Sequence, residues 1–163
     1  MGNYFWSGFS DKKLLELRLC DLNLKLEGSK ANNLLHKLYQ ELDSKGLKFV
    51  PHAWIGDDWY SPDGIPGLSI PFFVIHPRLS QLERTMIGEV EGGTSKSCMQ
   101  LLRHEAGHAI DNAFHLRKKK LRQELFGLSS TPYPENYEPM PYSKNYVRHL
   151  DDLYAQALSL IHI

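Results

Sequence analysis

The sequence has few cysteines, no long apolar run and no excess of charge of either sign. Its 163 residues include two cysteines, Cys20 and Cys98, and neither stands in a C-x-x-C or other paired spacing. We therefore expect reduced thiols rather than a disulfide. No apolar stretch reaches the roughly 20 residues of a membrane-spanning helix. The N-terminus also lacks the basic start and apolar core of a secretory signal, so we expect a cytoplasmic protein without a membrane partner.

The balance of charge limits the classes of partner. Lys plus Arg and Asp plus Glu both number 19, so the formal net charge is +0 at pH 7. No global field would recruit nucleic acid or an anionic membrane. A hydrophobic content of 42% is enough for one sizeable core, and we expect one domain or most of one. The oligomeric state is left open.

The most informative stretch is the pentapeptide His-Glu-Ala-Gly-His at residues 104–108. Two histidines four residues apart on an α-helix project from one face, so their imidazoles can share a metal ion. This is the H-E-x-x-H arrangement of zinc hydrolases. Zinc with an open fourth position acidifies a bound water, which a neighbouring carboxylate can deprotonate. His104 and His108 are therefore the candidate zinc ligands, and Glu105 is the candidate general base.

The residues around the motif predict the helix that this chemistry needs. Apolar residues recur at steps of three and four, namely Met99, Leu102, Ala106, Ala109, Ile110 and Ala113. This periodicity predicts a helix over residues 95–117. The two histidines and Asp111 lie on a different face from that stripe, free to point at a cleft. Asp111 is either an orienting partner of an imidazole or a solvated surface residue. The alternative for the histidines is an ordinary role in the core or on the surface.

Zinc needs a third protein ligand, and the motif helix does not provide one. The extended metzincin pattern requires glycine at 111 and histidine at 114, where Asp111 and Phe114 stand. His115 lies seven residues after His108, about 10.5 Å along an unbroken helix, and is too far for the same ion. The downstream candidates on a predicted helix are His149, Asp151 and Asp152. None of the three has a supporting motif.

Several stretches together resemble a family of bacterial zinc-binding metallopeptidases, over about residues 17–157. They are F-V-P-H-A-W-I-G-D-D-W-Y-S-P-D-G-I-P-G-L-S-I-P-F-F-V-I-H-P-R-L, E-V-E-G-G-T, C-M-Q-L-L-R-H-E-A-G-H-A-I-D-N-A and P-Y-S-K-N-Y-V-R-H-L-D-D-L-Y-A-Q-A. The resemblance implies zinc, a zincin-type fold and a peptide or protein substrate. In that family a helix corresponding to the one expected near Tyr146 leads into an acidic segment whose glutamate is the third ligand. This sequence ends before such a segment, so the resemblance does not supply the third ligand.

The last six residues suggest why that segment is missing. Residues 158–163 read L-S-L-I-H-I, a translation of CTG TCT CTT ATA CAC ATC, which resembles the transposon-end adapter of sequencing libraries. We expect residues 1–157 to form a partial zincin-like domain and residues 158–163 to be a non-native tail. The alternative is a genuine apolar helix end. If the third ligand is missing, the chain should bind zinc weakly and hydrolyse nothing.

The N-terminal half gives weaker signals. Residues 1–12 are rich in aromatic side chains, and we expect them to be a mobile tail. Alternating leucines favour a strand over residues 21–27, although Leu14, Leu15, Leu22 and Leu26 also suit a helix. A helical stripe of leucines follows, with Ser29 as its N-cap and Gly46 at its end.

Two further strands and two turns complete the expected fold. Residues 47–54 and 68–75 read as strands, separated by a turn at residues 61–64. Pro71 lacks an amide donor, which favours an edge or a bulge. The segment 92–97 resembles a phosphate-binding loop but lacks its glycine spacing, so we interpret it as a loop that caps the motif helix. The predicted fold is α+β, a zincin-like lobe with a small mixed or antiparallel sheet packed on the motif helix.

Two functions are compatible with these features. In the first, zinc-assisted amide hydrolysis uses Glu105 as the base, and a peptide adds to the edge strand at residues 68–75. In the second, a non-catalytic domain holds a partner at that edge. The proline-rich segment 129–142 is predicted to be a loop beside the cleft, with Tyr142 and Tyr146 as oxyanion donors or packing residues. The basic residues at 117–120 and Arg122 are interpreted as a solvated face.

Overall fold

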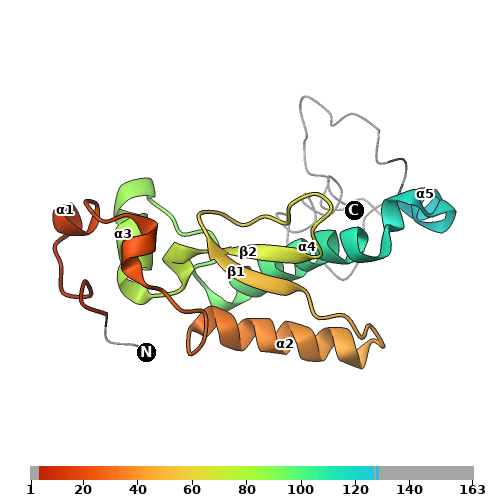
Figure 1. Ribbon diagram of the computed structural model, residues 1–163, viewed down its shortest axis with the longest axis horizontal. Helices are drawn as coiled ribbons and strands as arrows, with labels where there is room; N and C mark the ends of the chain where they lie inside the picture. The colour runs from red at the N-terminus through yellow and green to blue at the C-terminus, as the bar shows by residue number, and fades with distance from the viewer. Residues whose placement is uncertain (1–3, 127, 129–163) are drawn as a thin grey trace.

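The computed structural model describes residues 4–126 and 128, which form a mixed helix and strand fold (Figure 1). The described elements in chain order are α1 (Asp11–Leu14), the 3-10 helix η1 (Leu19–Leu22), α2 (Lys30–Ser44), β1 (His52–Gly56), β2 (Gly67–Pro71), η2 (Phe72–Val74), α3 (Pro77–Ile87), α4 (Ser95–Phe114), η3 (Leu116–Lys118) and α5 (Lys120–Phe126). The helices α2 and α4 are the longest, and α4 also packs on β2. The α+β class is therefore confirmed.

The two strands are parallel, so the prediction of a mixed or antiparallel sheet was wrong. β1 and β2 pair with His52 opposite Gly67 and Gly56 opposite Pro71. The chain between them runs back along the other side of β2, where Tyr60 forms an antiparallel bridge to Ser69. Because this connecting segment, residues 57–66, runs back along the sheet, β2 can start at the same end of the sheet as β1. Alternation of apolar and polar residues predicts a strand but does not predict how the chain connects one strand to the next.

Both strands are shorter than predicted. β1 begins at His52 instead of residue 47, and β2 ends at Pro71 instead of residue 75. Pro71 stands at the last position of β2, where its missing amide ends the ladder. The chain then turns into the 3-10 helix η2, so the apolar run after Pro71 is helical.

The main core lies between α2, α4 and the sheet. Its buried members are Ala31, Leu34, Leu35, Leu38, Leu42, Trp59, Leu68, Ile70, Ile75, Cys98, Met99, Leu101, Leu102 and Ala106. The leucines of α2 recur at helical spacing and face α4, which explains why the sequence signal for this helix was strong. The predicted cap is confirmed, because the Ser29 hydroxyl accepts a hydrogen bond from the Asn32 amide at 3.0 Å. Gly46 follows the helix with φ +78°.

A second apolar cluster is built from the N-terminal segment and α3. Its buried members are Trp6, Leu14, Leu22, Phe73, Leu79 and Leu82. The indole of Trp6 is fully buried and donates to the Leu22 carbonyl at 2.9 Å. The expectation of a mobile tail is thus wrong for the described residues from Tyr4 onward. The expected strand over residues 21–27 is also wrong, because η1 and the left-handed Asn23 (φ 48°) turn the chain there.

The motif helix α4 starts at the predicted residue, Ser95, and ends three residues earlier than predicted. Thr94 and Ser97 form a reciprocal capping box at its start, as expected of a capping loop. His115 adopts φ 51° directly after Phe114 and stops the helix. A left-handed conformation at a non-glycine residue has no clear sequence signal.

Other expectations fall on different parts of the chain. The turn at residues 61–64 is confirmed, with the Ile65 amide donating to the Pro62 carbonyl at 3.0 Å. Within the described residues, no helix is long and apolar enough to cross a bilayer. The expected loop at 129–142, Tyr142, Tyr146, the three downstream ligand candidates and the tail at 158–163 lie outside the described residues.

Candidate metal centre

The helix α4 brings the two motif histidines together. The Nε2 atoms of His104 and His108 are 3.3 Å apart, and their rings meet nearly at right angles (82°). Two ligands at roughly 2.0–2.1 Å from a tetrahedral zinc would have their nitrogens about 3.3–3.4 Å apart. The observed spacing therefore fits two ligands of one zinc ion. In the metal-free chain the same spacing also allows one ring to donate a hydrogen bond to the other.

Glu105 lies beside this pair in a buried position. Its residue is 6% exposed, and one carboxylate oxygen is 3.9 Å from His104 Nε2. The pKa of Glu105 is raised from 4.5 to about 7, mainly because the carboxyl group is buried and also because the carboxylates of Asp58 and Glu91 lie near it, while a hydrogen bond from the Ser61 amide acts in the opposite direction. A carboxyl group with a pKa near neutral can both accept and release a proton at physiological pH.

The described residues contribute two candidate ligands and no complete metal site. In residues 4–126 and 128, no group of three or more His, Cys, Asp or Glu side chains is placed to hold a metal ion. His115 follows the end of α4 and is exposed, in agreement with its exclusion as a ligand. The candidates His149, Asp151 and Asp152 are outside the described part of the chain.

Comparison with known proteins adds no family assignment. No family model, curated protein or solved structure matches this chain. The likeness to zinc-binding metallopeptidases thus stands as a resemblance in the quoted stretches, and we assign the candidate site from the geometry of α4 and its neighbours.

Asp111 binds Arg117 instead of orienting an imidazole. Its Oδ2 accepts from Arg117 Nε at 2.8 Å, and its Oδ1 accepts from the Arg117 amide at 2.6 Å. Arg117 also reaches Asp63 at 2.6 Å. Arg117 is therefore a structural residue of this end of α4, whereas the basic residues at 118–120 are exposed as expected. The interpretation of Arg117 as part of a solvated face was wrong.

Asn112 is an important residue that the sequence analysis missed. Its side chain is buried, donates to the carbonyls of Pro62 and Ile65 at 2.9 Å each, and accepts from the Gly64 amide at 3.2 Å. These bonds fix the turn after Tyr60 against the end of α4. A polar residue next to the apolar stripe was the available signal, but it does not identify partners some 50 positions away in the sequence.

The segment between the two strands occupies the edge of β2 opposite β1. The Ser69 amide donates to the Tyr60 carbonyl at 2.7 Å, so Tyr60 occupies the side of β2 opposite β1 at that position. The next residue, Ser61, directs its amide to Glu105. The predicted edge at residues 68–75 is therefore already paired at Ser69. A peptide could not add there without displacing Tyr60.

Proposed function

We propose that this protein is a zinc-dependent metallopeptidase that uses His104 and His108 as zinc ligands and Glu105 as its general base. The carrying observation is the 3.3 Å separation of the two Nε2 atoms on one helix, which matches the ligand spacing of a tetrahedral zinc. The helical position of the whole motif also supports the proposal, since H-E-x-x-H has this meaning only on a helix.

The side chains around the pair divide the work. Bound zinc would supply a Lewis acid that polarises the scissile carbonyl and makes water acidic enough to be used as a nucleophile near pH 7. Glu105 would take the proton from that water and give it to the leaving amine. The Ser61 amide orients the Glu105 carboxylate, and Asn112 holds the turn that follows Ser61. The chain therefore places its candidate base with contacts from outside α4.

Zinc titration of the 163-residue chain tests the ligands. We expect one zinc to bind weakly, because two imidazoles satisfy half of a four-coordinate ion. His104→Ala and His108→Ala should each remove this binding. His115→Ala is the matched control, because His115 is exposed and lies just past the same helix, and it should bind zinc like the unchanged chain.

Two results would change the assignment of ligands. Zinc binding that survives both His104→Ala and His108→Ala would overturn the proposed metal centre. Tight binding that is lost in Asp151→Ala or Asp152→Ala would show that the third ligand is within these 163 residues, contrary to our expectation.

The role of Glu105 is tested in a protein that carries the complete metal site. Glu105→Gln should lower peptide hydrolysis by about 10²- to 10⁴-fold, the usual contribution of a general base, and leave the zinc content nearly unchanged. Glu91→Gln is the control, because this exposed carboxylate influences Glu105 only at a distance, and it should retain most activity. Loss of zinc from Glu105→Gln would mean that Glu105 is a ligand.

A further inference from the structure

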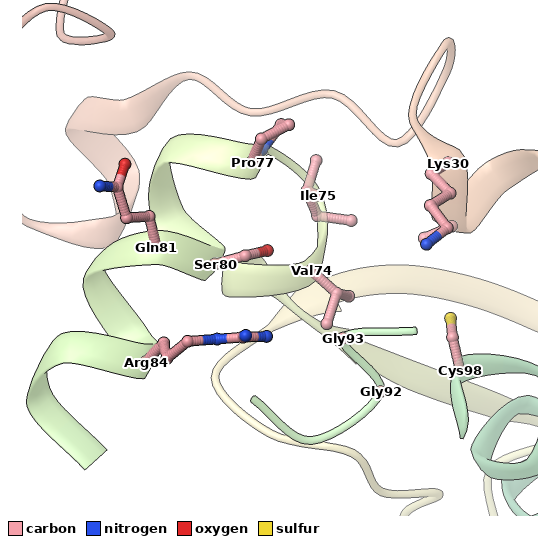
Figure 2. Close-up of a pocket in the computed structure, with 11 residues that line it drawn as sticks. Lys30, Val74, Ile75, Pro77, Ser80, Gln81, Arg84, Gly92, Gly93 and Cys98 are labelled. Atoms are coloured by element: carbon pink, nitrogen blue, oxygen red, sulfur yellow. The ribbon is translucent and has the colours of Figure 1, made fainter. Parts of the chain in front are cut away.

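A hollow lies near the start of α4, away from the histidines. It has a volume of about 460 Å³ and is walled by the start of α2, by η2 and α3, and by the glycine pair Gly92 and Gly93 (Figure 2). Ligand pockets typically measure roughly 300–1,000 Å³, so this hollow has room for a small molecule. Cys98 also lines it and precedes His104 by six residues, about 9 Å along the helix axis. We call this hollow the α4 N-terminal pocket.

The side chains of this pocket give it a positive charge without a compensating acid. Lys30 and Arg84 enter from opposite walls in Figure 2, and no Asp or Glu lines the pocket. In the described part of the chain, neither cation makes an ion pair. The ion pairs found there involve other residues. The two charges are thus available to a ligand.

The backbone adds to this field. Lys30 and Ala31 are the first two residues of α2, whose amides have no acceptor within the helix. The first turn of a helix carries a positive partial charge and favours an anion. The Ser29 hydroxyl satisfies the next amide, that of Asn32. The pocket therefore combines two full positive charges with the positive end of α2.

A third side of the pocket depends on glycine. Gly92 has φ +73°, and a Cβ there would lie 2.8 Å from Trp59 Cζ2. Trp59 is a buried member of the main core. Only glycine allows the chain to turn against Trp59 in this way. Val74 and Ile75 form an apolar floor between the charged walls. The pocket thus has a charged rim and an apolar floor, the pattern of a site for an anion with an apolar body.

We propose that the α4 N-terminal pocket binds a small phosphate monoester, with its phosphate between Lys30 and Arg84 and its apolar part on Val74 and Ile75. Arg suits phosphate through its planar fork of donors, and Lys serves as a point charge. This site is independent of zinc and goes beyond the proposed peptidase function. It gives a role to the glycine pair, which does not match a nucleotide-binding P-loop.

The test is a titration of the metal-free 163-residue chain, labelled with ¹⁵N, with inorganic phosphate and with phenyl phosphate. We expect saturable shifts of the amides of Lys30, Ala31, Gly92 and Gly93, and tighter binding of phenyl phosphate. Lys30→Gln and Arg84→Gln should each weaken binding by about fivefold, as expected for the loss of one solvent-exposed ionic contact. Lys37→Gln is the matched control, because Lys37 is an exposed lysine of α2 that does not line the pocket.

The outcomes separate the proposal from simple surface charge. Equal weakening by Lys30→Gln, Arg84→Gln and Lys37→Gln, or shifts spread over exposed lysines without saturation, would overturn the site. Equal affinity for the two probes would overturn the role of Val74 and Ile75. Both cations are exposed and should be replaceable without loss of fold, which the undisturbed amide spectrum of each variant checks. Because the titration uses the metal-free chain, a failure to bind phosphate would not count against the proposed metal centre.

Discussion

The two ends of α4 present opposite electrostatic environments. At the start of the helix, Lys30 and Arg84 face a pocket that no carboxylate lines. Further along, Glu105 is buried with the carboxylates of Asp58 and Glu91 near enough to raise its pKa. The formal net charge of the chain is +0, so this separation does not show in the composition. A chain with no net charge can therefore combine a pocket lined by two cations with a buried carboxyl group near other carboxylates.

The two ends are also held by different kinds of contact. Thr94 and Ser97, three residues apart, cap the start of α4 with hydrogen bonds of 3.0 and 3.2 Å between them. Near the end of the helix, Asn112 and Arg117 bind the turn at residues 62–65 and Asp63, some 50 positions away in the sequence. The start of the helix is locally determined, whereas the candidate metal centre depends on the return leg of the chain between β1 and β2.

The raised pKa of Glu105 should make the metal-free protein less stable as pH rises. The pKa of Glu105 is raised from 4.5 to about 7 in the fold, so the folded state holds this proton more tightly than the unfolded state. Its contribution is fully present below pH 4.5 and is lost as pH rises through about 7. The difference corresponds to about 3 kcal/mol of unfolding free energy. Denaturant unfolding at several pH values, with and without Glu105→Gln, measures it.

The two curves should separate in a defined direction. Glu105→Gln should match the unchanged chain near pH 4 and be more stable above pH 7. Glu41→Gln gives the contrasting case, because the hydrogen bond from Arg103 lowers the pKa of Glu41. A carboxylate of that kind stabilises above its unfolded pKa and loses its contribution as pH falls. Parallel curves for the unchanged chain and Glu105→Gln would show that Glu105 is not buried as described.

The sequence predicted the locally determined parts of the molecule. The cap at Ser29, the start of α4 at Ser95 and the turn at residues 61–64 each depend on residues within a few positions of one another. The apolar stripe likewise predicted that the motif is helical, and the four-residue spacing predicted that the histidines converge. Short-range hydrogen bonds and helical periodicity are sufficient for these features.

The features that the sequence did not predict depend on distant contacts. Leucines 22, 24 and 26 alternate like a strand, but Leu22 packs with Trp6 in the second cluster and Leu26 packs against the main core, so they are divided between two cores. The parallel pairing of β1 and β2 depends on the segment between them, in which Tyr60 pairs with Ser69 on the side of β2 opposite β1. Periodicity describes one element at a time and cannot assign such partners. α3 is different, because Pro77 at its start and Gly88 after its end are local signals from which this helix could have been predicted.

The hydrogen bonds that hold the turn at residues 62–65 against the end of α4 can be removed at Asn112. Asn112→Ala removes three hydrogen bonds to the turn, so the carbonyls of Pro62 and Ile65 lose this donor and the Gly64 amide loses this acceptor. We expect a loss of about 2 kcal/mol in unfolding free energy, measured by denaturant unfolding. Asn33→Ala is the control, because Asn33 is an exposed helical residue of α2, and it should change stability little. Equal effects of the two substitutions would mean that the turn is not held by Asn112.

The cap at the start of α4 can be tested at Thr94, where we expect a smaller loss of stability. Thr94→Ala removes the hydroxyl that accepts from the Ser97 amide, and loss of an N-cap typically costs about 1 kcal/mol. Thr85→Ala is the comparison, because the Thr85 hydroxyl bonds a carbonyl within α3 and caps nothing, so it should cost less. His104 lies ten residues after Thr94, about 15 Å along the axis, so the zinc affinity of Thr94→Ala should be unchanged while the helix start frays. A parallel fall in zinc affinity would show that the two ends of α4 are coupled, and the contrast between a locally held and a distantly held end would then not hold.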